Sequence, residues 1–341
     1  MAWTEKEIAD FQIINKKTLQ EVNATLRPDK NLSGKIGIGL PGQAGDLMTG
    51  MSILKYRDQI FPGKEIIWFA HQANADCLKY APISEVRAWP WANNGLPDGT
   101  PDLYPLVCDE NNRLNKEIAK DYEIVSDLEE MYFPAPWMLP PQKRHGIDYP
   151  NCSRNVFGID PMYEWHPVLN HSQEEIESVY DFMQQFPKTK SVLIETFAGS
   201  DQSKWDHSMT ENAIRLCREK WGGCNIFFAS HKYLRAQEQF PENFFDQEGV
   251  YHCAHFTPRM FALLQDYCQL IISVSSGITV ACSAWGTLPT PVIQFCGSFI
   301  CSTKSLAKGR HFELITADNK LLQIAQAEFG LRLEEILNKL K

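Results

Sequence analysis

The feature that most constrains the fold of this chain is a regular alternation of short apolar segments with segments of helical periodicity. The first apolar segment, KIGIGL at 35–40, precedes a helical pattern over 46–60, and Pro-Gly then leads to a second apolar segment at 65–70. A helical pattern at 73–80 and a strand pattern at 85–89 continue the run. Such alternation is typical of a parallel sheet whose strands are joined by crossover helices.

The same alternation resumes in the second half of the chain. We expect four strands and five helices there, the strands at 191–197, 225–229, 270–274 and 291–295 and the helices at 174–186, 207–221, 257–267, 278–285 and 317–341. The 341 residues suffice for two domains of about 150 residues. We therefore predict an α/β fold with two doubly wound, Rossmann-like domains, 1–165 and 166–341, and a ligand cleft between them.

The region between the two runs, 89–167, has a looser pattern that is rich in aromatic residues and proline. Only 111–131 has a clear helical pattern within it, and a polar helix is expected at 4–26. A long aromatic insertion in an α/β protein is often a ligand-facing segment, and Trp165 is one of four tryptophans suited to stacking on a sugar ring. An extended surface wrap or an oligomer contact is the alternative, and packing explains the tryptophans equally well.

Charge and cysteine content argue against several classes of protein. The chain has 33 basic and 42 acidic residues, a formal net charge of −9, so nucleic acid is not an expected partner. No run of about 18 apolar residues is present to span a membrane, and the N-terminus lacks the pattern of a signal peptide. Ten cysteines without a C-x-x-C pair favour reduced thiols, so we expect a cytoplasmic protein.

Three strand-to-helix turns contain residues suited to ligand binding or catalysis. The first follows the strand at 35–40. It contains Gly42, Gln43 and Gly45, where the glycine backbone turns sharply and lets a ligand come close. Asp46 stands at the expected start of the next helix. Its carboxylate is either an N-cap, worth about 1 kcal/mol, or a general base that takes a proton from an attacking hydroxyl. The spacing alone favours neither role.

The second turn follows the strand at 191–197 and contains Ser200 and Lys204. A lysine ammonium after a glycine turn suits a phosphate oxygen as a point charge, although this lysine taken alone is better explained as a solvated surface residue. The third turn contains Ser275, Ser276 and Gly277 at the start of a helix. Hydroxyls and free N–H groups at such a position form an anion site, and a simple serine cap is the alternative.

The order of these turns resembles the heptosyltransferase-like glycosyltransferases, which have the two-domain GT-B fold. In that family the first strand leads into a glycine-aspartate turn, matched here by Gly45 and Asp46, and the next strand begins just after Phe-Pro, matched at 61–62. The family's phosphate lysine precedes a tryptophan, as Lys204 does, and its donor-diphosphate turn is matched by 275–277.

The resemblance covers about 35–90 and 190–300, and a later family strand is matched by the segment PTPVIQFCG at 289–297. Two positions depart from the family. Ser275 replaces an aspartate, and Val280 stands where a histidine is usual. The donor sugar and the nucleotide are therefore open.

The resemblance implies an inverting glycosyltransferase of hexosyl or heptosyl type. Asp46 would be the base on the acceptor hydroxyl, Gly42, Gln43 and Gly45 would lie on the acceptor side, and the donor diphosphate would be bound by Ser200, Lys204, Ser275, Ser276 and Gly277. The implied partners are a nucleotide-sugar donor and a saccharide or glycoconjugate acceptor, with transient membrane contact if the acceptor is lipid-linked. No metal and no cofactor beyond this co-substrate is expected.

Two other functions fit the same sequence. A nucleotide-sugar epimerase on this fold would act on the donor itself, and a non-catalytic GT-B-like protein would only bind its ligand. The departures at Ser275 and Val280 support the second of these. A zinc site at His252, Cys253 and His255 would need a second pair of ligands, which the sequence does not supply.

Overall fold

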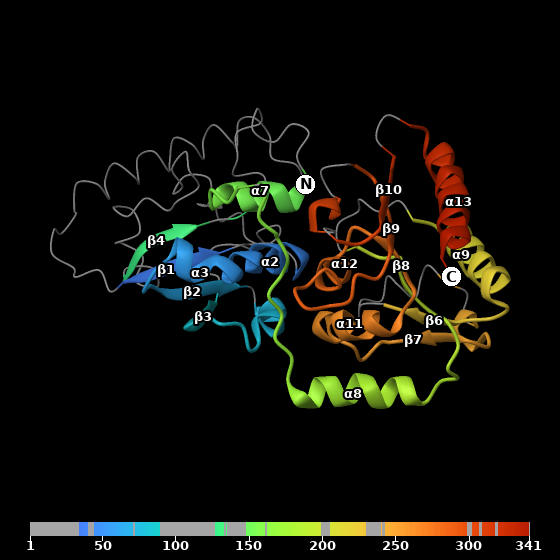
Figure 1. Cartoon of the computed structure of the whole chain (residues 1–341), viewed down its shortest axis with the longest axis horizontal. Coiled ribbons are helices and arrows are strands. Elements are labelled where there is room, and N and C mark those ends of the chain that lie inside the picture. Colours follow the sequence, from blue (N-terminus) through green and yellow to red (C-terminus); the bar gives the residue numbers. More distant parts are fainter. Residues whose placement is uncertain are drawn as a thin grey trace, which may run out of the picture.

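The chain folds into two α/β lobes that lie side by side in Figure 1. The computed structural model describes residues 34–39, 44–70, 72–88, 127–132, 134, 148–160, 162–198, 205–229, 240, 243–298, 302–306, 309–317 and 320–340. The helix predicted at 4–26 and most of the aromatic insertion lie outside these residues. No helix in the described part of the chain is long and apolar enough to cross a membrane.

The N-terminal lobe is built on a four-stranded parallel sheet with the order β3-β2-β1-β4. Its strands are β1 (Lys35–Gly39), β2 (Glu65–Ala70), β3 (Glu85–Ala88) and β4 (Leu128–Tyr132). Its helical segments are α2 (Ala44–Gly50), η1 (Met51–Tyr56), α3 (Arg57–Ile60), η2 (Gln72–Leu78) and α7 (Tyr149–Val156). The strands β1 and β2 pair in register from Lys35↔Glu65 to Gly39↔Phe69, as expected for consecutive strands joined by a crossover.

Two sequence predictions for this lobe differ from the structure. The helix expected at 111–131 does not reach its predicted end, because 128–132 forms β4 and pairs with β1. Leu128, Met131 and Tyr132 are buried there, so packing against the sheet overrides the helical propensity of the Leu-Glu-Glu-Met segment. The helix expected at 73–80 is a 3₁₀ helix.

The C-terminal lobe contains a six-stranded parallel sheet with the order β10-β9-β8-β5-β6-β7. Its strands are β5 (Ser191–Glu195), β6 (Asn225–Phe228), β7 (Val250–His252), β8 (Leu270–Val274), β9 (Val292–Cys296) and β10 (Phe312–Thr316). Its helical segments are α8 (Gln173–Gln184), α9 (His207–Trp221), η5 (Phe244–Asp246), α11 (Pro258–Leu264), η6 (Gln265–Tyr267), α12 (Gly277–Ala281), η8 (Lys304–Leu306) and α13 (Leu322–Lys339). The described elements of both lobes thus form the two parallel α/β sheets that the sequence predicts, whereas the boundary at 165/166 stays a prediction.

The two edge strands of this sheet, β7 and β10, were not predicted from the sequence. The strand β7 has only three residues, and β10 has a charged residue and mostly half-buried positions. Short or partly polar edge strands lack the continuous apolar run that marks the central strands β5, β8 and β9.

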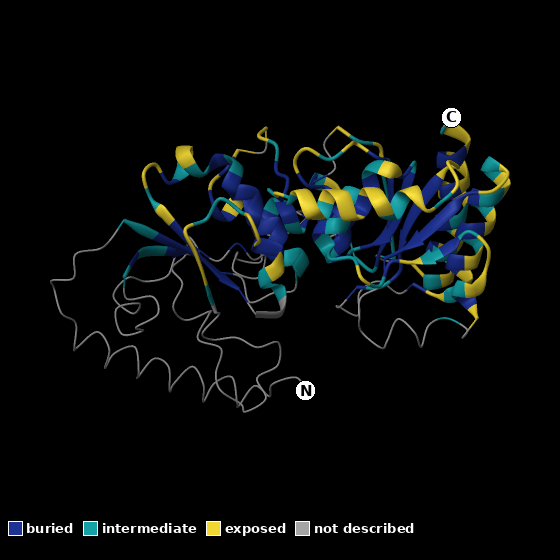
Figure 2. Ribbon diagram, turned by 90° about the horizontal axis from the view of Figure 1, so that it is seen from below, coloured by how far each residue is buried: buried dark blue, intermediate teal, exposed yellow. Residues whose placement is uncertain are grey.

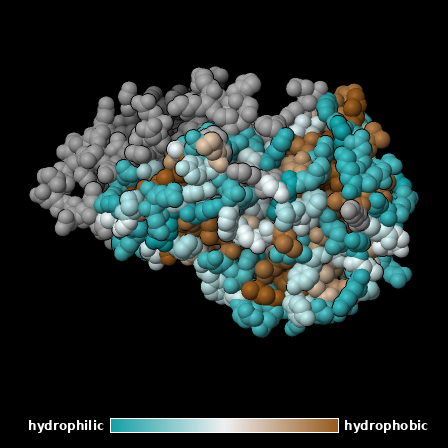
Figure 3. Space-filling view, in the orientation of Figure 1, coloured by the Kyte–Doolittle hydropathy of each residue, from teal (hydrophilic) through white to brown (hydrophobic). Residues whose placement is uncertain are grey.

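Helices cover both faces of the C-terminal sheet. Apolar side chains of α9 and α13 pack on one face, and those of α11 and α12, with Val179 of α8, pack on the other. Figure 2 shows both sheets as buried layers and α8 as a largely exposed helix. The visible surface in Figure 3 is mainly hydrophilic, with a hydrophobic area near α8 and α11.

The two lobes share one hydrophobic core. The apolar cluster around α2 and η1 of the N-terminal lobe also contains Ala262, Val280, Ala281, Ala284 and Leu306, which belong to the C-terminal sequence half. All five are less than 6% exposed. The lobes are therefore joined by a dry contact rather than by a flexible linker alone.

Candidate functional site

The glycine turns of the two lobes meet where their strands end. A Cβ atom placed on Gly45 would lie 3.1 Å from the Cα of Gly277, and a Cβ placed on Gly277 would lie 3.0 Å from the backbone N of Gly45. These separations involve backbone atoms, which cannot move aside as the end of a flexible side chain can. Glycine at both positions therefore allows the backbones of α2 and α12 to approach closely.

Asp46 lies next to this contact, in the first turn of α2. The helix begins at Ala44, so Asp46 is inside the helix rather than at the N-cap position that the sequence left open. Its side chain is half-buried. The first turn is fixed by Thr49, whose hydroxyl donates to the carbonyl of Gly45 over 2.8 Å. The structure thus brings Asp46 and Gly45 of the first lobe beside Gly277 of the second.

Ser276 caps α12. Its Oγ accepts the backbone N–H of Thr279 at 3.2 Å, and the Thr279 hydroxyl in turn donates to the carbonyl of Val274 at 2.8 Å. Ser276 is 7% exposed and Ser275 is half-buried. The capping alternative for Ser276 is therefore realised in this structure, and a role for Ser275 and Ser276 in donor binding stays a prediction.

Four of the predicted site residues, Gly42, Gln43, Ser200 and Lys204, lie outside the described residues. The neighbour of Lys204, Trp205, is described and is a core residue. Its indole N–H donates to Thr210 Oγ1 at 2.8 Å, and its ring packs edge-on against Phe329 with centroids 5.0 Å apart. The tryptophan that follows Lys204 is therefore an anchored core residue just before α9, and a role for Lys204 in phosphate binding stays a prediction.

Sequence analysis gave no role to Glu195, the last residue of β5. Its side chain is completely buried, and Oε1 accepts the backbone N–H of Phe197 at 2.8 Å. Oε2 has no hydrogen-bond partner among the described residues. Burial raises the pKa of Glu195 well above its usual value, against the smaller lowering effect of the Phe197 N–H. The sequence feature that could have identified Glu195 is an acidic residue at the end of an otherwise apolar strand.

Two alternatives from the sequence can be judged directly. Trp165 is 1% exposed within the core shared by the lobes, so stacking of Trp165 on a sugar is excluded. No group of three potential metal ligands occurs among the residues that the structure describes. His252, one of the residues considered for zinc, stacks on Phe245 with ring centroids 4.8 Å apart.

One cavity of about 590 Å³ lies away from the glycine turns. It lies at the amino-terminal ends of β6 and β7. Its lining includes Asn225, which begins β6, and Gly249, which precedes β7. Ligands of doubly wound sheets bind at the carboxyl ends of the strands, so this cavity is not the expected site.

Comparison with known proteins supports the fold. No protein-family model matches the chain, and no curated protein matches its sequence. Among solved structures, a family 9 glycosyl transferase from Veillonella parvula DSM 2008 matches with a TM-score of 0.59 and 12% identity, covering 89% of this chain and 96% of that one. E. coli ADP-heptose lps heptosyltransferase II matches with a TM-score of 0.54 and 15% identity, covering 89% of this chain and 99% of that one.

A third match is the E. coli heptosyltransferase WaaC with ADP, with a TM-score of 0.52, 14% identity and coverage of 88% of this chain and 99% of that one. At identities of 12–15% this likeness shows the fold. The chain has the GT-B fold, and its structure resembles the heptosyltransferases as its turn motifs predict.

Proposed function

We propose that this protein transfers a sugar from a nucleotide-diphosphate donor to a hydroxyl of a saccharide or glycoconjugate acceptor. The observation that carries the proposal is the backbone contact between Gly45 and Gly277. Asp46 directly follows Gly45 in the chain, and Gly277 belongs to the turn that resembles the family's diphosphate turn, so the contact supports a role for both in one site. A base and a leaving-group site on opposite sides of one junction are what a single displacement requires.

In the proposed reaction the acceptor lies against the N-terminal lobe and the donor against the C-terminal lobe. The Asp46 carboxylate accepts the proton of the acceptor hydroxyl as its oxygen attacks the anomeric carbon. The bond from that carbon to the diphosphate breaks, and the configuration inverts. One positioned carboxylate is sufficient for this route, and general-base catalysis of this kind contributes about 100- to 10,000-fold to the rate.

The leaving diphosphate gains negative charge as its bond breaks. We assign its stabilisation to the backbone N–H groups of the 275–277 turn and to the ammonium of Lys204. Because these groups supply the positive potential, the route calls for no metal ion. The ADP named for one of the similar structures makes ADP the first nucleotide to test on this chain.

The experiment compares Asp46→Asn with the matched control Asp58→Asn, a change on the same helical stretch at a side chain that is 92% exposed. Thermal unfolding in millimolar ADP, GDP, UDP and CDP tests donor-site binding. We expect one nucleotide to raise the melting temperature of all three proteins, and transfer to fall at least about 100-fold only in Asp46→Asn. Unchanged turnover in that variant would remove Asp46 from the role of base.

A non-catalytic nucleotide-binding protein is the second candidate, and Val280 favours it. This residue replaces the family's histidine and is 5% exposed inside the core shared by the lobes, where an apolar side chain supplies no ligand contact. In that case a nucleotide would raise the melting temperature, but no nucleotide sugar would be consumed with any acceptor. An epimerase would instead convert the nucleotide sugar without an acceptor.

A further inference from the structure

A segment of the C-terminal sequence half crosses to the N-terminal lobe. It follows β9, the neighbour of β8 in the sheet, and it contains η8. The side chain of Leu306 at its end is completely buried in the core around α2 and η1. The segment 302–306 therefore contacts both lobes, and we call it the crossing segment. Its polar contacts show how each lobe binds it.

In the C-terminal lobe the crossing segment is bound by Gln294 on β9. The amide nitrogen of Gln294 donates to Thr303 Oγ1 at 3.0 Å, and the amide oxygen accepts the backbone N–H of Thr303, also at 3.0 Å. Both residues are buried. Buried hydrogen bonds of this kind are strengthened by the low local dielectric, so Gln294 fixes the backbone and the side chain of Thr303 together.

The amide of Gln294 also contacts the end of β8. Its nitrogen donates to the carbonyl of Val274, the last residue of β8, over 3.4 Å. The same carbonyl accepts the hydroxyl of Thr279 in α12. Ser275 directly follows Val274, so Gln294 and Thr279 fix the strand end at which the predicted diphosphate turn begins.

In the N-terminal lobe the crossing segment is bound by Asp148, the buried N-cap residue of α7. Oδ1 of Asp148 accepts the backbone N–H of Asn151 at 3.3 Å and the hydroxyl of Ser305 at 2.8 Å. Oδ2 accepts the backbone N–H of Ser305 at 2.8 Å. The bond to Asn151 is sufficient for a helix cap, so the two bonds to Ser305 call for another explanation.

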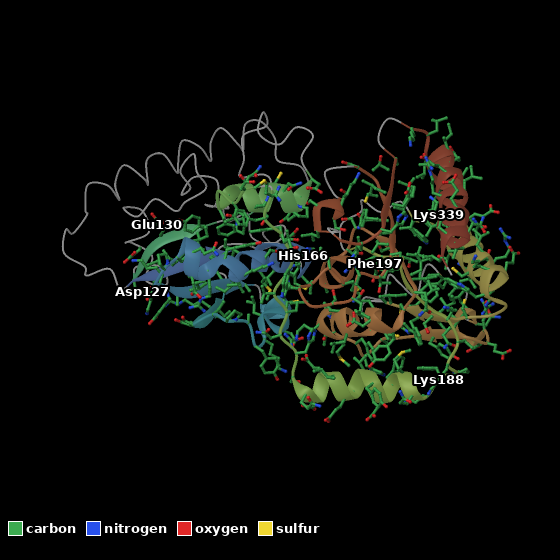
Figure 4. The ribbon with its side chains drawn as sticks, viewed as in Figure 1. Asp127, Glu130, His166, Lys188, Phe197 and Lys339 are labelled. Atoms are coloured by element: carbon green, nitrogen blue, oxygen red, sulfur yellow. The ribbon has the colours of Figure 1, made fainter. Side chains whose placement is uncertain are left out.

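The contacts continue from α7 to the predicted base. The helix α7 packs against α2, which contains Gly45 and Asp46. The far end of α12 is bound by the segment that joins the lobes: His166 Nδ1 lies 2.9 Å from the carbonyl of Ser283, and Figure 4 shows His166 where the two lobes meet. A continuous connection thus leads from the diphosphate turn through the crossing segment to the helix of the base.

We propose that Gln294 and Asp148 are positioning residues that set the place of the 275–277 turn relative to Asp46. Gln294 fixes the end of β8 to the crossing segment, and Asp148 fixes the crossing segment to the lobe that contains the base. Buried side chains that are locked by hydrogen bonds are suited to this task, because they hold reacting groups in one geometry. The link to catalysis rests on the proposed function, whereas the effect on the contact between α2 and α12 does not.

The test breaks the connection at each of its ends in the full chain. Gln294→Met removes the amide at similar side-chain volume. Asp148→Asn keeps an acceptor for the α7 cap but has no second acceptor for the Ser305 N–H. Ser305→Ala, a milder change, removes only the hydroxyl. The matched control is Thr290→Val, which removes a buried hydroxyl that donates to the Gln265 carbonyl at 3.1 Å, just before the opposite end of β9.

The first readout needs no substrate. In protein labelled with 15N-glycine, the amide signals of Gly45 and Gly277 report the contact between α2 and α12. We expect both signals to shift in Gln294→Met and in Asp148→Asn. Ser305→Ala should shift them in the same direction by less, which keeps the test available if a stronger variant does not fold. The control should lower the melting temperature and leave both signals in place.

The second readout is the transfer reaction of the proposed function. We expect kcat to fall about 10- to 100-fold in both Gln294→Met and Asp148→Asn, because the base and the leaving group are misplaced. In Asp148→Asn the Kd for ADP should stay within about twofold of the wild type, since the end of β8 keeps its own contacts. Gln294→Met, which alters those contacts, should also weaken ADP binding. The control should keep its kcat.

Two results would overturn the proposal. Unshifted glycine signals in folded Asp148→Asn would show that the crossing segment does not set the contact between the lobes. An equal loss of kcat in Thr290→Val would show that lowered stability alone explains the effect. If the wild type binds no nucleotide and transfers no sugar, the proposed function fails, and the glycine signals alone decide whether Gln294 and Asp148 position the two lobes.

Discussion

Two of the regions in which the lobes meet have opposite character. At the glycine contact, Gly45 and Gly277 bring two backbones together without side chains. On the side of α8 and α11, Arg259 is completely buried and donates to both oxygens of Glu175, over 2.9 and 2.5 Å. It also donates to the carbonyl of Lys79 in the other lobe at 2.5 Å. We infer that the first region sets the position of Asp46, and the second holds the lobes together.

Arg259 is surrounded by further contacts that cross between the lobes and the segment joining them. Its guanidinium lies 5.1 Å from the centre of the Tyr80 ring, and its backbone carbonyl is 2.9 Å from His171 Nε2. Asn170 Nδ2 donates to the Tyr80 carbonyl at 2.8 Å. A buried cation with this many partners is costly to remove, because the partners are left without compensation.

The largest effect on stability is therefore expected for Arg259→Met. Loss of the guanidinium strands the Glu175 carboxylate, whose side chain is 15% exposed, and should cost about 3–5 kcal/mol of unfolding free energy. Urea unfolding checks this value. The double variant Arg259→Met/Glu175→Gln should recover part of the loss, since it leaves no buried charge unpaired. Equal stability of single and double variants would mean that the ion pair is not what holds this region.

Gly277→Ala should have a smaller effect on stability and a larger one on activity. The new Cβ would meet the Gly45 backbone at 3.0 Å, so the lobes must shift at the position of Asp46. Overpacking of this kind costs about 1–3 kcal/mol. The control is Gly330→Ala on α13, where the new Cβ meets only the movable Asn212 side chain at 2.9 Å.

The measurements for Gly277→Ala are urea unfolding and transfer rate on the same samples. Activity should fall in Gly277→Ala and remain in Gly330→Ala and in folded Arg259→Met. If Arg259→Met lost transfer while fully folded and Gly277→Ala kept it, the inference would be reversed. The Arg259 region would then set the position of Asp46, and the glycine contact would hold the lobes together.

The smallest effect on stability is expected when the pH is lowered and the Glu175 carboxylate is protonated. Burial raises the pKa of Glu175, but the Arg259 guanidinium and the Ser172 N–H lower it more, so the net pKa is below its usual value of 4.5. A lowered folded-state pKa gives stability that is complete above pH 4.5 and is lost as the pH falls through the folded-state value. This loss of stability is checked by comparing the melting temperatures of the wild type and Glu175→Gln between pH 7 and 3. The wild type should lose its advantage on acidification, and a constant difference would contradict the prediction.

Sequence reasoning succeeded where local patterns determine structure. Apolar segments bounded by glycine and proline predicted β1, β2, β5 and β8, and the rule that ligands bind beyond strand ends pointed to the turns that contain Gly45 and Gly277. It failed where tertiary packing decides. The segment at 128–132 has helical composition but completes a sheet, and Trp165 looks suited to ligand stacking but fills the core.

The interactions at the lobe junction could not be predicted at all. Arg259 and Lys79 are 180 residues apart, and no periodicity in either segment signals their contact. Glu195 gave a weak signal as an acid at the end of an apolar strand, but that no cation among the described residues pairs with it is visible only in the folded structure. Long-range pairing and burial are properties of the folded chain, not of local spacing.

The core that extends through both lobes limits how such a protein can be recombined. Exchanging halves between relatives is an attractive way to mix donor and acceptor preferences, and 165/166 is the obvious crossover point. A chimera joined there would place a foreign surface against Ala262, Val280 and Leu306, which share one buried cluster with α2 and η1 of this chain. Useful hybrids therefore have to transplant those apolar positions of α11, α12 and η8 together with the N-terminal half.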